Sequence, residues 1–147
     1  MPRIHSISDS QMIRIFFAQT GLLRWYSDGK QENAMSAVYT IGHSSHTFET
    51  FAGLLAGHGI EVVVDTRSAP YSKYAPQFDR EALRRDLTAC GVKYLFLGEE
   101  LGGRPRGDDF YDATGRVLYG KRRNDAKFQA GMERLERGMA QFRVALM

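Results

Sequence analysis

The sequence predicts an α/β protein, a single three-layer domain with a mostly parallel sheet of about four strands and helical crossovers. Short apolar segments alternate along the chain with segments of helical periodicity. Residues 48–65 and 81–99 also share one order of features, namely helix, glycine, apolar strand and acidic residue. Such tandem units join parallel strands through helices, and near-continuous apolar strands indicate a sheet that is covered on both faces.

Four segments are predicted to be strands because they are short, apolar and rich in β-branched or aromatic residues. They are residues 38–41, 60–64, 92–97 and 142–147, and the last of them is predicted to be buried. A helix is expected before each of the last three, starting after Thr47, after Asp79, and after Asn124 or Asp125, whose side chains can cap a helix. The inner face of the second helix is expected to carry Ala82, Leu83, Leu87 and Cys90.

The length of 147 residues is sufficient for one domain with its own hydrophobic core. Residues 1–34 lack clear periodicity, so we interpret them as an atypical extension that precedes an α/β domain at 35–147. Met35, just before the first clear strand, is then a candidate natural start. The alternative is that residues 1–34 form a short hairpin or helix that packs on the sheet edge.

The composition limits which ligands, compartments and membrane partners are expected. A net charge of +3 permits an anionic ligand, although a solvated basic surface is the simpler explanation. A single cysteine, Cys90, excludes a disulfide within the chain and fits a reducing compartment. No apolar run reaches membrane-spanning length. We therefore predict a cytoplasmic protein without a membrane partner.

If the strands are parallel, their carboxyl ends meet at one edge of the sheet, where α/β proteins bind ligands. Polar loops follow three predicted strands there, at residues 42–46, 65–70 and 98–104. The candidate acid–base residues are His43, Asp65 and Glu99. The candidate ligand-binding residues are Ser44, Arg67, Ser68, Tyr71, Gly102, Gly103 and Arg104.

Each of these residues also has a structural interpretation. His43 can simply bind the backbone, and Asp65 can pair with Arg67 to organise its loop instead of taking part in chemistry. The tyrosines and cations of residues 67–78 suit a phosphate or a stacked base, or else a loop packed by its aromatic rings. Residues 121–123, a basic triplet, are interpreted as a solvated helix start, with an anion contact as the alternative.

The motifs of common cofactor sites are weak or missing. His43 and His46 are three residues apart, and Asp65 can join them as a metal ligand, but this spacing alone is poor evidence. Neither a phosphate loop with its lysine nor GxGxxG occurs. We therefore expect neither a metal nor a cofactor.

Several of these segments resemble the bacterial and archaeal domain-of-unknown-function family 488. They are residues 39–44 (YTIGHS), 64–70 (VDTRSAP), 76–78 (PQF) and 101–105 (LGGRP), followed by 111–112, 115–117 and 128–131. The resemblance covers about residues 37–147. It implies a compact α/β domain without an established activity.

The resemblance also implies a loop of the form Cys-x-Glu followed by Cys-His-Arg after the last strand. The sequence stops just before such a loop, which would lie beside His43, Asp65 and Arg67. It would supply a nucleophile, acid–base groups and an anion clamp. We therefore expect a domain that is truncated at its C-terminus and a candidate site that is incomplete.

Two functions remain open at this point. The first is an enzyme-like domain that binds a phosphate-bearing ligand, a nucleotide or nucleic acid, at the carboxyl-end edge. The second is a non-catalytic binding or interaction module, inactive because the last loop is missing. In that second case an exposed final strand, residues 144–147, would favour a homodimer.

Overall fold

The computed structural model describes residues 13–17, of which only the backbone is considered, and residues 37–147. They contain a five-stranded sheet in the order β1-β2-β5-β3-β4. The strands are β1 (Ile13–Phe17), β2 (Ala37–Ile41), β3 (Val62–Asp65), β4 (Lys93–Phe96) and β5 (Val144–Leu146). Strands β2, β5, β3 and β4 are parallel, and β1 runs antiparallel to β2 at the edge. The predicted α/β class with a mostly parallel sheet is confirmed.

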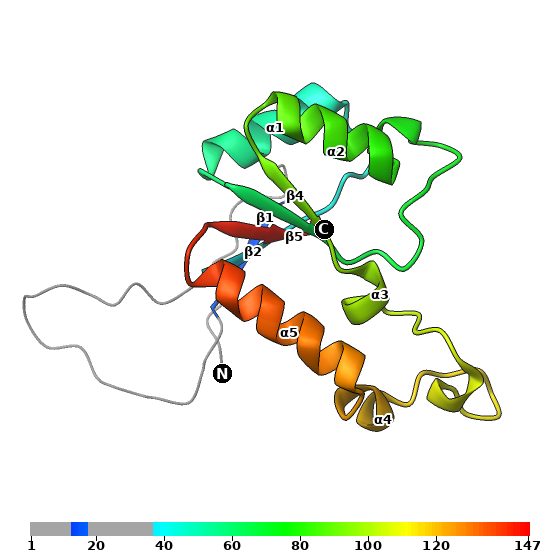
Figure 1. Cartoon of the computed structure of the whole chain (residues 1–147). Coiled ribbons are helices and arrows are strands. Elements are labelled where there is room, and N and C mark those ends of the chain that lie inside the picture. The colour runs from blue at the N-terminus through cyan, green and yellow to red at the C-terminus, as the bar shows by residue number, and fades with distance from the viewer. Residues whose placement is uncertain (1–12, 18–36) are drawn as a thin grey trace, which may run out of the picture.

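Helices cover both faces of this sheet (Figure 1). On one face lie α1 (Phe48–Gly57) and α2 (Arg80–Ala89), and on the other lie α5 (Ala126–Met139) and the short α3 (Gly98–Leu101). Three more short elements complete the described chain: η1 (Pro76–Phe78), η2 (Asp108–Phe110) and α4 (Tyr119–Arg123). The domain therefore has the three layers that the apolar strands predicted.

Alternation along the strands divides the core into two clusters. Val63 points to the face covered by α1 and α2, where it packs with Phe51, Leu55 and Leu83. Its neighbours Val62 and Val64 point to the opposite face, where the second cluster forms around Leu135 of α5. Because successive strand residues alternate between faces, Asp65 lies on the same face as Val63.

The strand order creates a change of direction beside β3. The chain passes from β2 through α1 to β3, then through α2 to β4, and returns through α5 to β5, which lies between β2 and β3. Adjacent strands β3 and β4 are therefore followed by segments that lead to helices on opposite faces (Figure 1). Such a position, at the carboxyl ends of the strands, is where open α/β sheets usually bind ligands.

Most helix starts agree with the sequence prediction. The Thr47 hydroxyl accepts a hydrogen bond from the Thr50 N–H at 3.3 Å, and the Asp125 carboxylate accepts one from the Phe128 N–H at 3.1 Å. Asp79 precedes α2, but its side chain accepts from the Ser72 N–H instead of capping the helix. Cys90 is exposed at the end of α2, so its expected position on the inner face is wrong.

The last strand is buried, as its apolar sequence predicts, and is not the exposed strand that the second of the two functions assumed. Strand β5 is central in the sheet, and its Val144 and Ala145 are buried. The homodimer expectation therefore loses the exposed strand on which it relied. The predictions for most of residues 1–34, and for Met35 as a start, fall on residues outside the described ranges; within that stretch β1 pairs with the sheet edge. No helix in the described part of the chain is long and apolar enough to cross a membrane.

Candidate functional site

The carboxyl end of β3 carries a buried ion pair. Asp65 is fully buried, and the Arg67 guanidinium donates to both of its oxygens, from Nε to Oδ1 at 2.9 Å and from Nη2 to Oδ2 at 2.7 Å. The backbone N–H of Arg67 donates a third hydrogen bond to Oδ1 at 3.0 Å. A buried carboxylate is costly unless it is paired and hydrogen-bonded. This carboxylate meets both conditions within a single loop.

Tyr94 of β4 completes the network. Its hydroxyl donates to Oδ2 of Asp65 at 2.7 Å, across from the neighbouring strand. Burial of the Tyr94 phenol, together with this hydrogen bond and the charge of Asp65, raises its pKa. Burial of Arg67 acts to lower its pKa, but the hydrogen bond and charge of Asp65 outweigh this effect and raise it. Asp65 therefore receives four donors.

Arg67 keeps one nitrogen outside this network. Its Nη2 also donates to the carbonyl oxygen of Phe78 at 2.8 Å, which fixes the guanidinium at a second point. Its Nη1 has no hydrogen bond to any described residue, and it is not among the buried unpaired atoms. The side chain is 18% exposed. Arg67 therefore presents an unused donor at the surface, held in a fixed orientation by Asp65 and Phe78.

The loop after β4 packs tightly against the loop after β3. A Cβ atom on Gly98 would lie 2.1 Å from the Arg67 carbonyl oxygen, and one on Gly102 would lie 2.4 Å from Oγ of Ser68. The Ser68 hydroxyl oxygen also accepts a hydrogen bond from the Arg104 N–H at 2.8 Å. The structure thus brings together Asp65, Arg67, Ser68, Gly102 and the backbone of Arg104.

His43 joins this group through a ring contact. Its imidazole stacks on the Phe78 ring with centroids 4.9 Å apart, and the Phe78 carbonyl is the one that Arg67 binds. Nδ1 of His43 lies 3.0 Å from the carbonyl oxygen of Ser44. A carbonyl only accepts, so Nδ1 carries the proton and Nε2 of the neutral ring holds the lone pair. Within the described residues His43 makes no hydrogen bond to Asp65.

Arg80, at the start of α2, is a functional candidate that the sequence analysis missed. Its guanidinium lies 4.1 Å from the centre of the Phe96 ring, a cation–π contact. It also lies close enough to Tyr94 and Tyr71 to affect the pKa of both phenols. Across the described chain its side chain has no carboxylate partner. Arg80 is therefore a second cation with unused donors near the end of β4.

Four other predicted site residues make no hydrogen bond to Asp65 in the described part of the chain. Glu99 is exposed and pairs with Lys127 of α5 at 3.4 Å. Tyr71 is 59% exposed, and its hydroxyl donates to Glu81 at 3.1 Å. Ser44 is exposed, with a φ of 44° that places it in the left-handed region. Gly103 is exposed, with open space around its Cα.

Arg122 differs from its predicted role as a solvated helix start. It is only 6% exposed and pairs with Asp125 at 2.6 Å. Its Nη2 also donates to the carbonyl oxygens of Glu99 and Glu100, at the end of α3. A basic triplet gives no indication of which arginine turns inward, so this structural residue was not identifiable from the sequence.

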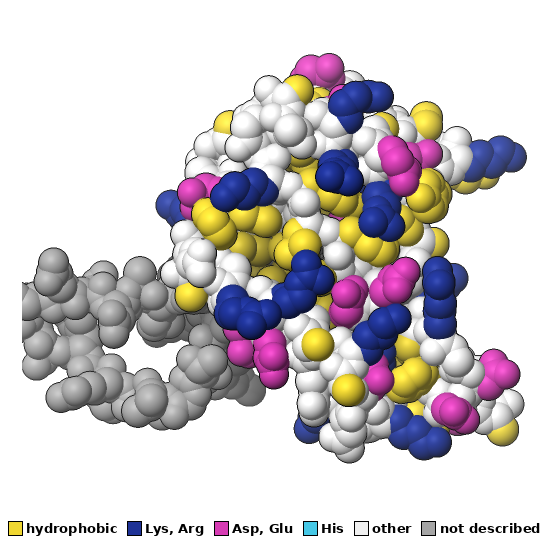
Figure 2. Space-filling view, in the orientation of Figure 1, with side chains coloured by type: hydrophobic (Ala, Val, Ile, Leu, Met, Phe, Trp, Pro, Cys, Tyr) yellow, Lys and Arg dark blue, Asp and Glu magenta, His cyan; other side chains and the backbone are white. Residues whose placement is uncertain are grey.

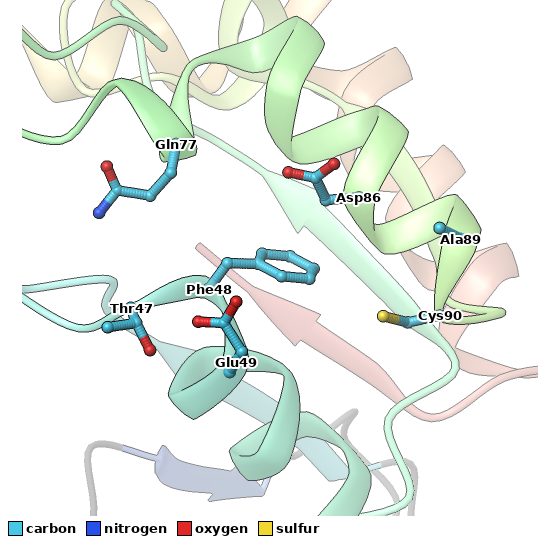
Figure 3. A pocket seen from close by; sticks show the side chains of 7 residues that line it. All are labelled: Thr47, Phe48, Glu49, Gln77, Asp86, Ala89 and Cys90. Carbon is cyan, nitrogen blue, oxygen red and sulfur yellow. The ribbon is translucent and has the colours of Figure 1, made fainter.

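One hollow lies elsewhere and has the wrong charge for an anion. It encloses about 570 Å³ between the start of α1 and α2 (Figure 3), with Glu49 and Asp86 in its wall beside Phe48 and Cys90. A smaller hollow of about 260 Å³ lies between α5 and strands β3 and β4, where Figure 2 shows an apolar surface bordered by Lys and Arg. Neither is lined by Asp65 or Arg67, although Tyr94 of the same network borders the smaller hollow.

Metal ligation is not suggested by the arrangement of side chains. No three His, Cys, Asp or Glu side chains gather into a metal-binding group within the described ranges. His46 contributes its carbonyl oxygen to a contact with the Gln77 amide at 3.3 Å, and its own Nε2 is buried without a partner. The polar cluster at the end of β3 is thus built from an ion pair, a phenol and backbone groups.

Comparison with known proteins gives one match. The family model described as "Domain of unknown function DUF488" matches residues 47–147, which include β3, β4 and the loops of the candidate site. No curated protein and no solved structure matches the chain. The matched segment is most of the chain and agrees with the resemblance seen in the sequence motifs. The chain belongs to the DUF488 family, a family of unknown function.

Proposed function

We propose that this domain binds a phosphate-bearing ligand, a nucleotide or nucleic acid, at the carboxyl ends of β3 and β4. The observation that supports this function is the pair of arginines beside Tyr94. Arg67 carries an unused Nη1 donor and Arg80 has no carboxylate partner, and both act on the pKa of the Tyr94 phenol. Arginine is well suited to phosphate because its planar group offers several donors in fixed geometry.

Preorganisation favours Arg67 as the first contact. Asp65, Phe78 and Tyr94 hold the ion pair before any ligand arrives, so binding costs little side-chain entropy. In this proposal Asp65 positions Arg67 and does not transfer protons, because four donors already occupy its oxygens.

Backbone groups of the second loop extend the proposed anion contact. The N–H groups of Gly102 and Arg104 are bound to the Gly98 carbonyl and to the Ser68 hydroxyl. The N–H of Gly103 has no acceptor among the described residues, and the residue is exposed. Exposed backbone N–H groups of this kind are common phosphate contacts. Gly103 therefore offers a neutral donor between Gly102 and Arg104, which both approach Ser68 in the loop of Arg67.

His43 is the proposed acid–base residue if the domain is an enzyme. Its Nε2 lone pair is free of hydrogen bonds to described residues, and its ring is fixed by Phe78 and by the Ser44 carbonyl. Glu99 is left out of this role because its carboxylate pairs with Lys127.

The second candidate is binding without catalysis. It is favoured by the occupied Asp65 carboxylate, which leaves His43 as the single acid–base group that the proposal can use. The wild-type protein and a His43→Gln variant, each incubated with a ligand that binds, separate the two. Chemical change of the ligand that depends on His43 supports an enzyme, and an unchanged ligand supports a binding module.

Thermal shift against inorganic phosphate, mononucleotides and short oligonucleotides tests the proposed function. We expect at least one phosphate-bearing ligand to raise the melting temperature of the wild-type protein, because a ligand that binds only the folded state stabilises it. Arg80→Gln should abolish the shift. Arg123→Gln, which removes the same charge from an exposed position on α4, should preserve it. Equal shifts in both variants would exclude the proposed site.

A further inference from the structure

A loop beside the arginines carries two exposed tyrosines. Tyr71 is 59% exposed and Tyr74 is 92% exposed, and both lie between β3 and η1. Lys73, also exposed, stands between them. Large aromatic rings lose water-exposed apolar area when they bind a flat partner, so exposed rings that are held in place form a natural stacking surface.

The loop is held at both ends and in the middle. Buried Pro70 and Ala75 anchor the residues next to each tyrosine. The Ser72 hydroxyl oxygen accepts hydrogen bonds from the N–H groups of Tyr74 and Ala75, at 3.3 and 3.2 Å. The backbone is thus ordered before binding, which lowers the entropy cost of using the exposed rings.

The side chains of this loop are also tied to the start of α2. The Asp79 carboxylate accepts from the Ser72 N–H at 2.8 Å, and the Tyr71 hydroxyl donates to Glu81 at 3.1 Å. The hydrogen bond to Glu81 is the main cause of a raised pKa for the Tyr71 phenol. Both acidic groups are therefore engaged in holding the loop, and the Tyr71 ring is kept near Arg80, whose charge lowers that same pKa.

We propose that the ligand of this site is single-stranded nucleic acid, whose bases stack on Tyr71 and Tyr74 while its phosphates contact Arg67, Arg80 and Lys73. This inference rests on the proposed function and names its substrate class. Aromatic rings interleaved with cations are the usual means of binding single strands without reading their sequence. A duplex keeps its bases stacked inside, so it offers no faces to these rings.

The number of cations and aromatic rings at the site also fits a nucleic-acid strand better than a mononucleotide. One guanidinium and one ring suffice for a single nucleotide, whereas this surface has two arginines, a lysine and two tyrosines, ordered along the segment from β3 to α2. The short loop extends away from the end of the sheet in Figure 1, on the side where the segment after β4 also leaves. A chain of nucleotides can therefore continue beyond the arginines onto the tyrosines.

Fluorescence anisotropy with a labelled oligonucleotide of about twelve thymidines tests this proposal. Tyr71→Ala and Tyr74→Ala should each weaken binding roughly tenfold, as expected for loss of one stacked base. Tyr119→Ala is the matched control, because Tyr119 is 75% exposed but lies on α4. It should leave the affinity unchanged, and a duplex of the same length should bind more weakly than the single strand.

Measurements with thymidine monophosphate separate this proposal from the proposed function. We expect Arg80→Gln to weaken both ligands and Tyr74→Ala to weaken only the oligonucleotide. Binding of the monophosphate without stronger binding of the oligonucleotide would overturn the single-strand proposal and leave the proposed function standing. Equal affinity of Tyr74→Ala and wild type for the oligonucleotide, or preference for the duplex, would also overturn it. If neither ligand binds, both the single-strand proposal and the proposed function are wrong.

Discussion

The ion pairs Arg67–Asp65 and Arg122–Asp125 have similar shortest N–O distances, 2.7 and 2.6 Å, and differ in which donors each arginine leaves unused. Arg67 is held by Asp65 and the Phe78 carbonyl, and its Nη1 remains unused at the surface. Arg122 is enclosed by the protein, and its unpaired Nε is buried.

The difference follows from where each pair lies. Arg122 joins α4 to the end of α3, because it donates to backbone carbonyls that α3 leaves unpaired. The rings of Phe110 and Phe128 lie 5.4 and 5.5 Å from its guanidinium carbon. Arg67 instead lies just after a parallel strand, and its side chain remains 18% exposed. The Arg122–Asp125 pair thus acts as an internal clamp between α4 and α3, whereas the Arg67–Asp65 pair holds an unused hydrogen-bond donor at the surface.

The largest expected effect is loss of the internal clamp. Arg122→Met removes the charge that Asp125 and two carbonyls share, and should lower the free energy of unfolding by about 3 kcal/mol. This is at the lower end for a buried pair because the Asp125 side chain remains 24% exposed. Urea denaturation measures it, with Arg123→Met as an exposed neighbour that should change little. Similar stability of the two variants would show that Arg122 is no clamp.

A smaller effect is expected where the two loops of the candidate site meet. Gly98→Ala places a Cβ 2.1 Å from the Arg67 carbonyl oxygen and 2.5 Å from the Phe96 ring, so the loop that carries Arg67 must move. We expect a loss of roughly 2 kcal/mol, typical of overpacking, together with weaker ligand binding. Gly103→Ala meets nothing within 4 Å and is the control for stability. If Gly98→Ala unfolds at the same urea concentration as wild type, the close packing is not real.

The smallest effect concerns Tyr94. Tyr94→Phe removes one of the four donors to Asp65 but leaves Arg67 in place, so near neutral pH we expect a loss of about 1 kcal/mol. The pKa of the Tyr94 phenol is raised in the folded state, so the fold retains this proton more strongly than the unfolded chain does. Its contribution is complete below the unfolded pKa of about 10 and declines as the pH rises above it.

Wild type should therefore lose more stability than Tyr94→Phe between neutral pH and about pH 10 to 11. Urea denaturation of both proteins over this range measures the difference, and each variant is compared with itself at neutral pH. Parallel pH curves would mean that Tyr94 is not coupled to Asp65 in solution.

The sequence was informative where local chemistry determines the structure. Thr47 and Asp125 were identifiable as caps because their function depends on residues three positions away. Asp65 and Arg67 were identifiable as a pair because they are two residues apart at a strand end. The tandem units of helix and strand predicted that the strands are parallel, although they did not predict the order of the strands in the sheet.

Contacts between neighbouring strands could not be predicted from the sequence in the same way. Tyr94 reaches Asp65 only because β4 lies beside β3 in the sheet, and the register pairs Asp65 with Phe96. The one indication in the sequence was that Tyr94 is a polar aromatic residue in a short apolar strand. This does not indicate which residue its hydroxyl binds. The burial of β5 followed from its apolar residues, but its position between β2 and β3 depends on the return of the chain through α5 and was not identifiable.

Arginine side-chain NMR gives the most direct test of the difference between the two pairs. Nε–H signals are recorded for the wild-type protein during titration with thymidine monophosphate. The signals of Arg67 and Arg80 should shift together and saturate at one ligand concentration, while that of Arg122 stays in place. Shifts that involve Arg122 equally, or that leave Arg67 and Arg80 unchanged while other arginines respond, would contradict a phosphate site at the end of β3.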